Sequence, residues 1–261
     1  MNSTISHLFG TKNRPAAILL THGHFDHVGS LKQLIEQWEI PVYAHPLEFP
    51  YLTGRFDYPP PDPSVKNGLV AELSWIYPKK PIDITSHLKQ LSTDYSVPFL
   101  PEWKYIHTPG HSPEHVSFFR DSDKLLIAGD AIVTTKQESA FFVLLQKKEL
   151  SGPPKYFTYD WEAAGSSVRE LAKLNPKIIA TGHGQPLYEE QAAKDLRNLA
   201  ENFHSLAVPK QGRYVTEPAV VNESGIEYVP PKKWAFPFLL ALLFIIISFL
   251  IFLLIYTLNA A

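Results

Sequence analysis

The stretch THGHFDHVGS, residues 21–30, places four potential metal ligands close together: His22, His24, Asp26 and His27. Histidine is otherwise scarce, with 11 copies among 261 residues. The chain contains no cysteine, so thiolate ligands and cysteine nucleophiles are excluded. Imidazole and carboxylate groups remain, and both are common ligands of Zn²⁺ and related divalent ions. The stretch therefore indicates a metal site built from histidine and aspartate.

The segments around this stretch predict a layered α/β fold. The apolar run AAILL, residues 16–20, leads into it and is expected to form a buried strand. A helix is expected over residues 29–38, because large apolar side chains recur at helical spacing: Leu31, Leu34, Ile35 and Trp38. The run IPVYAH, residues 40–45, predicts the next buried strand. Strand, loop, helix and strand in this order are typical of layered α/β domains.

Three further predicted strands also end in a potential ligand. WKYIHT, residues 103–108, leads to His111; KLLIAGD ends at Asp130; and KIIATGHG contains His183. Loops at the ends of buried strands are held firmly, while their side chains can converge on one point. A histidine or aspartate at four strand ends therefore predicts a single shared site.

The motifs HGHFDH, TPGH, AGD and TGHG, in this order, resemble those of the metallo-β-lactamase superfamily, and most closely its glyoxalase II-like group. The resemblance covers about residues 16–206. It implies an α/β fold, a four-layered αββα sandwich with metals at one edge of the paired sheets. It also implies a dinuclear site, with His22, His24 and His111 on one metal, Asp26, His27 and His183 on the other, and Asp130 between them.

Such a site is expected to hydrolyse a small ester, thioester or lactone. Two neighbouring cations lower the pKa of a shared water, which makes a metal-bridged hydroxide the expected nucleophile. The cofactors would be two divalent ions, with Zn²⁺ favoured and Mn²⁺ or Fe²⁺ as alternatives. Asp26 is expected to act in catalysis as well, by holding this hydroxide or passing on its proton.

Two alternatives to a hydrolase stay open at this point. Persulfide dioxygenases share the same motifs but use a single iron, and a non-catalytic metal-binding membrane module would need the metal only for its structure. A structural zinc site is closed by four ligands. Seven potential ligands exceed that number, which favours an enzyme with open metal positions.

The region over residues 46–101 is expected to be a proline-rich insertion that borders the site. Four of its side chains could contact a substrate, although packing against the domain is favoured for them: Tyr51, Arg55, Tyr58 and Trp75. Among the remaining histidines, His115 is either a partner of a metal ligand or an ordinary strand residue. Structural roles are expected for His45 and His107.

The C-terminal run of residues 234–258 lacks any charged residue and predicts a transmembrane helix. Lys232 and Lys233 precede it and no charge follows, so the positive-inside rule places the main domain in the cytoplasm. The expected domains are a metallo-hydrolase domain over residues 1–206, a linker over 207–233, and a single-pass anchor in contact with membrane lipid.

Two further expectations concern the partners and the start of the chain. We expect a small-molecule substrate, and no nucleic acid, because a formal net charge of −2 provides no overall basic field. About 20 residues precede the first motif, whereas the resemblance implies further strands there. A fold lacking its first strands, from a chain that is naturally longer, is therefore expected.

Overall fold

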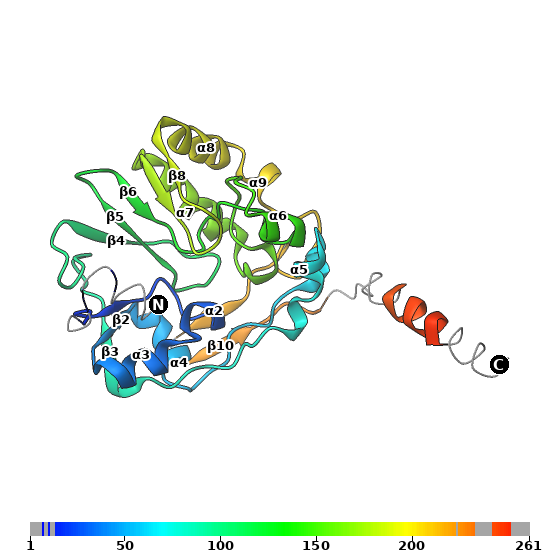
Figure 1. Cartoon of the computed structure of the whole chain (residues 1–261), viewed down its shortest axis with the longest axis horizontal. Helices are drawn as coiled ribbons and strands as arrows, with labels where there is room; N and C mark the ends of the chain where they lie inside the picture. Colours follow the sequence, from blue (N-terminus) through cyan, green and yellow to red (C-terminus); the bar gives the residue numbers. More distant parts are fainter. Residues whose placement is uncertain (1–6, 8–9, 11–13, 223, 233–241, 252–261) are drawn as a thin grey trace.

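The computed structural model describes residues 7, 10, 14–222, 224–232 and 242–251. Two sheets form its centre (Figure 1). The smaller sheet is parallel, with the order β1-β2-β3, and consists of β1 (Ile18–Leu19), β2 (Val42–Ala44) and β3 (Leu88–Gln90). The larger has the order β4-β5-β6-β7-β8, over Trp103–His107, Val116–Arg120, Leu125–Ile127, Ile178–Ala180 and Leu187–Tyr188. Its neighbouring strands are antiparallel except for β6 and β7.

Helices cover the outer faces of both sheets, which gives four layers. Helix α3 (Leu31–Trp38) buries its apolar side against β1 and β2 through Leu31 and Ile35. Helices α7 (Trp161–Lys173) and α8 (Glu189–Glu201) pack on the larger sheet (Figure 1). A third apolar cluster joins the two sheets, with Tyr105, Val116 and Phe118 facing residues of β1 and β2. The predicted layered α/β architecture is confirmed.

Short helices complete the chain between these elements. They are α2 (Phe25–Val28), α4 (Phe49–Leu52), α5 (Leu69–Glu72), α6 (Ala140–Leu145) and α9 (Phe203–Leu206). The 3₁₀ helices are η1 (Pro46–Glu48), η2 (Pro63–Val65), η3 (Ser74–Ile76), η4 (Thr85–His87) and η5 (Lys155–Phe157). Most of them lie in the proline-rich region, where proline prevents longer helices.

The proline-rich region contains a strand that the sequence pattern does not predict. β3 lies at residues 88–90 and pairs in parallel with β2. Parallel neighbours need a long crossover connection. Residues 45–87 provide that connection, which gives much of the region an architectural role in the smaller sheet.

The segment after α9 contacts the domain. Arg213 N–H donates a hydrogen bond to Asp62, and Tyr214 is buried and donates to the carbonyl of Pro60. A hairpin follows, formed by β9 (Val220–Asn222) and β10 (Gly225–Tyr228). Part of the predicted linker is therefore held by contacts with the proline-rich region.

The C-terminal prediction requires a correction. Throughout the described ranges, we find no helix with the length and apolar character needed to cross a membrane. Only residues 242–251 of the predicted span are described as helical, and the rest of 234–258 lies outside the described residues. A helix of that length rises about 15 Å, half of a hydrocarbon core of about 30 Å. The predicted single-pass anchor with a cytoplasmic domain is wrong by this finding.

Candidate metal centre

The structure brings all seven predicted ligands together where the strands of both sheets end. Their potential ligand atoms form three groups, each with all atoms within 4.8 Å of one another. The inner half is the group His22, His24 and His111, and the outer half is the group Asp26, His27 and His183. The third group, His22, His27 and Asp130, connects the two halves.

The inner half is a cluster of buried imidazoles whose nitrogen atoms face one another. His111 Nε2 lies 2.9 Å from His24 Nδ1 and 3.2 Å from His22 Nε2. Burial, with the neighbouring histidines, lowers the pKa of His22 and His111 well below the ordinary value. Burial also lowers the pKa of His24 to about 4. Neutral imidazoles with converging lone pairs are the form that binds cations.

The outer half combines imidazole with carboxylate. His183 Nε2 lies 3.2 Å from Asp26 Oδ2 and 3.1 Å from Asp130 Oδ2. His27 Nε2 lies 3.4 Å from Asp130 Oδ1. Burial opposes a charge on His183, but the two carboxylates raise its pKa to about 10. A positive charge is therefore favoured at the point where these side chains meet.

Asp130 lies between the halves. Its Oδ2 is also 3.6 Å from His111 Nε2 in the inner half, and its Oδ1 has no hydrogen-bond partner although it is buried. A cation held at 2.0–2.1 Å by tetrahedral ligands keeps those ligands roughly 3.3 Å apart. The separations between the ligand atoms lie near this value, so the donor set fits divalent cations in both halves.

Local backbone geometry allows this convergence. Asp26 and His27 lie in the first turn of α2, which starts directly after the loop from β1. Opposite them, Gly182 comes so close that a Cβ atom there would collide with Asp130 Oδ1 and lie 2.8 Å from the His27 ring. The TGHG motif therefore needs glycine at this position for steric reasons.

His115 supports Asp130, which decides between the two roles left open for it. The side chain is fully buried, and its Nε2 accepts a hydrogen bond from Asp130 N–H at 2.9 Å. Its Nδ1 lies 2.8 Å from Thr108 Oγ1, which contacts Ser117. Burial lowers the pKa of His115 to about 3, so the ring is neutral and can accept at Nε2. His115 therefore holds the backbone of the Asp130 loop.

Among the other predicted contact residues, Tyr58 reaches a candidate ligand, with its ring centroid 4.6 Å from that of His24. Tyr51 and Tyr58 are buried and stack with ring centroids 4.0 Å apart, as expected for packing. Arg55 is exposed, and Trp75 is 58% exposed. His45 and His107 stack on each other at 4.6 Å, outside the three ligand groups.

Two buried residues near the centre were missed by sequence reasoning. Tyr159 OH lies 3.4 Å from His24 Nε2, and Glu48 accepts hydrogen bonds from the loops that carry His24 and His111. The available signal for Glu48 was a single carboxylate in the otherwise apolar run PLEFPYL, residues 46–52. Nothing local distinguishes Tyr159 from other tyrosines.

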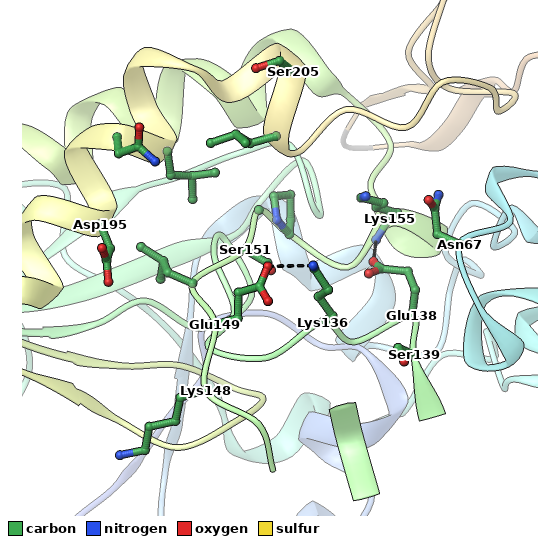
Figure 2. Close-up of a pocket in the computed structure, with 16 residues that line it drawn as sticks. Asn67, Lys136, Glu138, Ser139, Lys148, Glu149, Ser151, Lys155, Asp195 and Ser205 are labelled. Carbon is green, nitrogen blue, oxygen red and sulfur yellow. Dashed lines mark hydrogen bonds and ion pairs between the residues drawn. The ribbon is translucent and has the colours of Figure 1, made fainter. Parts of the chain in front are cut away.

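A separate hollow of about 700 Å³ contains none of the candidate ligands. Figure 2 shows its mixed lining, in which Lys136 pairs with Glu149 at 2.7 Å. Lys148, Lys155, Glu138 and Asp195 also line it, so the charges of both signs offset one another. Its chemistry indicates no particular ligand, and the metal centre remains the candidate site.

Comparison with known proteins agrees with the geometry. The model of the "Metallo-beta-lactamase superfamily" matches residues 9–183. The chain belongs to the metallo-β-lactamase superfamily. The probable metallo-hydrolase YflN of Bacillus subtilis (strain 168) is 50% identical over 198 residues, covering 76% of this chain and 75% of the relative.

Two further similarities are more distant. Hydroxyacylglutathione hydrolase GloC of Haemophilus influenzae is 27% identical over 169 residues, covering 64% of this chain and 68% of GloC. The crystal structure of the metallo-beta-lactamase family protein TTHA1429 from Thermus thermophilus has a TM-score of 0.51 at 17% identity, covering 78% of this chain and 65% of that one. The last similarity concerns the fold alone. The superfamily binds divalent metals, and this metallo-hydrolase has a histidine-rich candidate site for them.

Proposed function

We propose that this metallo-hydrolase binds two divalent ions, with Zn²⁺ favoured, and hydrolyses a small ester, thioester or lactone. The observation that carries the proposal is the pair of ligand groups connected through His22, His27 and Asp130. One closed site would need four ligands, whereas this arrangement offers seven: three in each half and Asp130 between the halves. Two adjoining sites with few ligands each leave positions for water and substrate.

When bound, the two cations would supply a water that ionises near neutral pH and a Lewis acid for the carbonyl group. Asp130 would fix the position of the two halves relative to each other, because its carboxylate is within 3.6 Å of ligand nitrogens in both. His115 would hold the Asp130 backbone during turnover through its hydrogen bond at 2.9 Å. The protein contributes a rigid ligand frame to the reaction.

Asp26 is proposed as both ligand and proton acceptor. Its side chain is 35% exposed, far more than Asp130 at 3%. Burial acts against its charge, but the hydrogen bond with His183 and the nearby His27 lower the pKa of Asp26. An ionised carboxylate open to solvent can orient the attacking water and accept its proton.

Aromatic side chains beside Asp26 would border the substrate. Tyr77 lies 5.7 Å from the ring of Phe25 and 6.2 Å from that of Phe157. Burial and the charge of Asp26 raise the pKa of Tyr77, so its phenol stays neutral. This aromatic wall would exclude water and receive the apolar part of a small acyl compound. The name of GloC, a hydroxyacylglutathione hydrolase, makes such an acyl compound a reasonable first substrate to test.

Metal analysis and turnover would test the proposal together. Purified protein, stripped and reloaded with Zn²⁺, Mn²⁺ or Fe²⁺, should hold about two ions per chain and hydrolyse at least one member of an ester, thioester and lactone panel. One firmly held ion without turnover would contradict the proposal and favour a structural metal. Oxygen uptake with a persulfide substrate by the iron form alone would favour the dioxygenase alternative.

A further inference from the structure

Glu48 is a buried carboxylate that connects two loops of the metal centre without being a candidate ligand. It ends η1 at the start of the proline-rich region, and its side chain is completely buried. Its Oε2 accepts a hydrogen bond from Gly23 N–H at 3.1 Å. Its Oε1 accepts one from Ser112 Oγ at 3.0 Å. One side chain therefore holds the backbone of one loop and the side chain of another.

The two loops are those that carry the inner half. Gly23 lies between His22 and His24, and Ser112 directly follows His111. The carboxylate of Glu48 thus bridges the segments whose nitrogen atoms meet at 2.9 and 3.2 Å. A contact at each of these points restrains all three imidazoles relative to one another.

Tyr58 fixes the carboxylate from a third direction. Its hydroxyl donates to Glu48 Oε2, and its ring packs against His24 with centroids 4.6 Å apart. The ring also stacks on Tyr51 at 4.0 Å. Tyr58 therefore connects Glu48 to a candidate ligand.

This arrangement is costly for the fold, which argues against an incidental role. Burying a carboxylate away from water is unfavourable unless hydrogen bonds compensate. Burial raises the pKa of Glu48 to about 7 against the effect of its three donors. A second buried carboxyl, Glu114, adds to the cost, and its Oε2 has no hydrogen-bond partner. A purely apolar residue would fill the same space without these penalties.

We propose that Glu48 is a positioning residue that keeps the three imidazoles of the inner half converged before a cation binds. The proposal rests on the proposed function only in treating His22, His24 and His111 as ligands. Partners behind a ligand shell commonly contribute 10- to 100-fold to metal affinity. Glu48 would act in this range through Gly23 and Ser112.

Asp62 offers a matched control elsewhere in the chain. It is also a buried carboxylate, it accepts from Ser64 N–H at 3.0 Å and Ser64 Oγ at 2.6 Å, and it accepts from Arg213 N–H. It belongs to none of the three ligand groups. Substitutions at Asp62 and Glu48 therefore remove the same kinds of hydrogen bond, but only one set involves the metal centre.

Cobalt titration of the metal-free full-length chain tests the proposal without relying on activity. Glu48→Ala should weaken the binding of Co²⁺ by roughly 10- to 100-fold and alter its visible d–d absorption. Glu48→Gln should recover much of the affinity, because one amide oxygen can still accept from Gly23 and Tyr58. Asp62→Ala should lower the melting temperature but leave the Co²⁺ affinity within about twofold of wild type. Should Glu48→Ala fail to fold, Ser112→Ala compared with Ser64→Ala provides the same contrast.

The different failures can be distinguished. Equal Co²⁺ affinity and equal spectra in wild type and the Glu48 variants would overturn the positioning role while leaving the metal centre intact. A wild-type protein that binds no Co²⁺ would overturn the proposed function and the role of Glu48 with it. If the Asp62 and Glu48 substitutions weakened Co²⁺ binding equally, Glu48 would contribute to the stability of the fold in general and not to the metal centre in particular.

Discussion

The two halves of the metal centre differ in their exposure to solvent. The inner imidazoles are closed off, with exposed fractions of 0%, 3% and 1% for His22, His24 and His111. The outer side chains are more open, at 35%, 17% and 20% for Asp26, His27 and His183. A buried donor set holds a cation in a fixed, dry environment, whereas an open one leaves room for exchange. The comparison suggests that the inner half retains a cation firmly and the outer half meets the substrate.

The largest effect is expected where the two halves join. Asp130→Asn weakens the charge that both cations would share, so we expect a loss of activity on the order of 1,000-fold, equivalent to about 4 kcal/mol of transition-state stabilisation. Metal analysis should show fewer than two ions per chain. Asp195→Asn, at an exposed helix position, serves as the control and should change little. Full activity in Asp130→Asn would contradict the proposal that Asp130 connects the two halves of the metal centre.

A smaller effect is expected from His115, which touches Asp130 only through the backbone. His115→Ala should lower metal affinity by roughly 10- to 100-fold, because the Asp130 loop loses the acceptor that holds it. His107→Ala is the matched control, since that histidine lies on the neighbouring strand and contacts His45 and the carbonyl of Pro113 rather than Asp130. Competition with a metal-binding dye would measure both variants. Equal affinities for the two variants would contradict the role assigned to His115.

The contrast between His115 and His107 shows which roles the sequence could predict and which it could not. The seven candidate ligands were found because each follows a strand end and carries ligand chemistry, and both signals are local. The roles of His115 and Glu48 depend on contacts between residues far apart in the chain, such as Glu48 with Ser112. A single buried carboxylate in PLEFPYL gives no indication of which loop it will meet.

The fold shows the same division between local and distant information. The helix over Leu31–Trp38 and its neighbouring strands β1 and β2 follow from the pattern of apolar residues. β3 was missed, because Leu88–Gln90 is short and only partly buried, and pairing with β2 rather than pattern makes it a strand. The C-terminal error has a different origin. Hydropathy measures apolar length, but spanning also requires a continuous helix, which the described residues do not provide.

Removal of metal would test the two halves directly. A chelator should extract the outer cation first, at least about tenfold faster than the inner one, because exposed donors allow the chelator to approach. Metal content and activity followed over time should then fall in two phases, with activity lost in the first. The ligand variant His183→Ala should show only the slow phase. Loss of both ions in one phase from wild type would contradict the difference between the halves.

The smallest effect is expected at the aromatic wall beside the outer half. Tyr77→Ala should raise KM severalfold with little change in kcat, because the ring, which packs on Phe25 and Phe157, would border the proposed substrate without contacting the reacting atoms. Both cations should stay bound, since no candidate ligand makes a hydrogen bond with Tyr77 among the contacts described. Tyr95→Ala is the control, because Tyr95 is 57% exposed and packs on Tyr105 instead. If Tyr77→Ala lowered kcat and left KM unchanged, the ring would act on the reaction itself, and the outer half would extend beyond its three ligands.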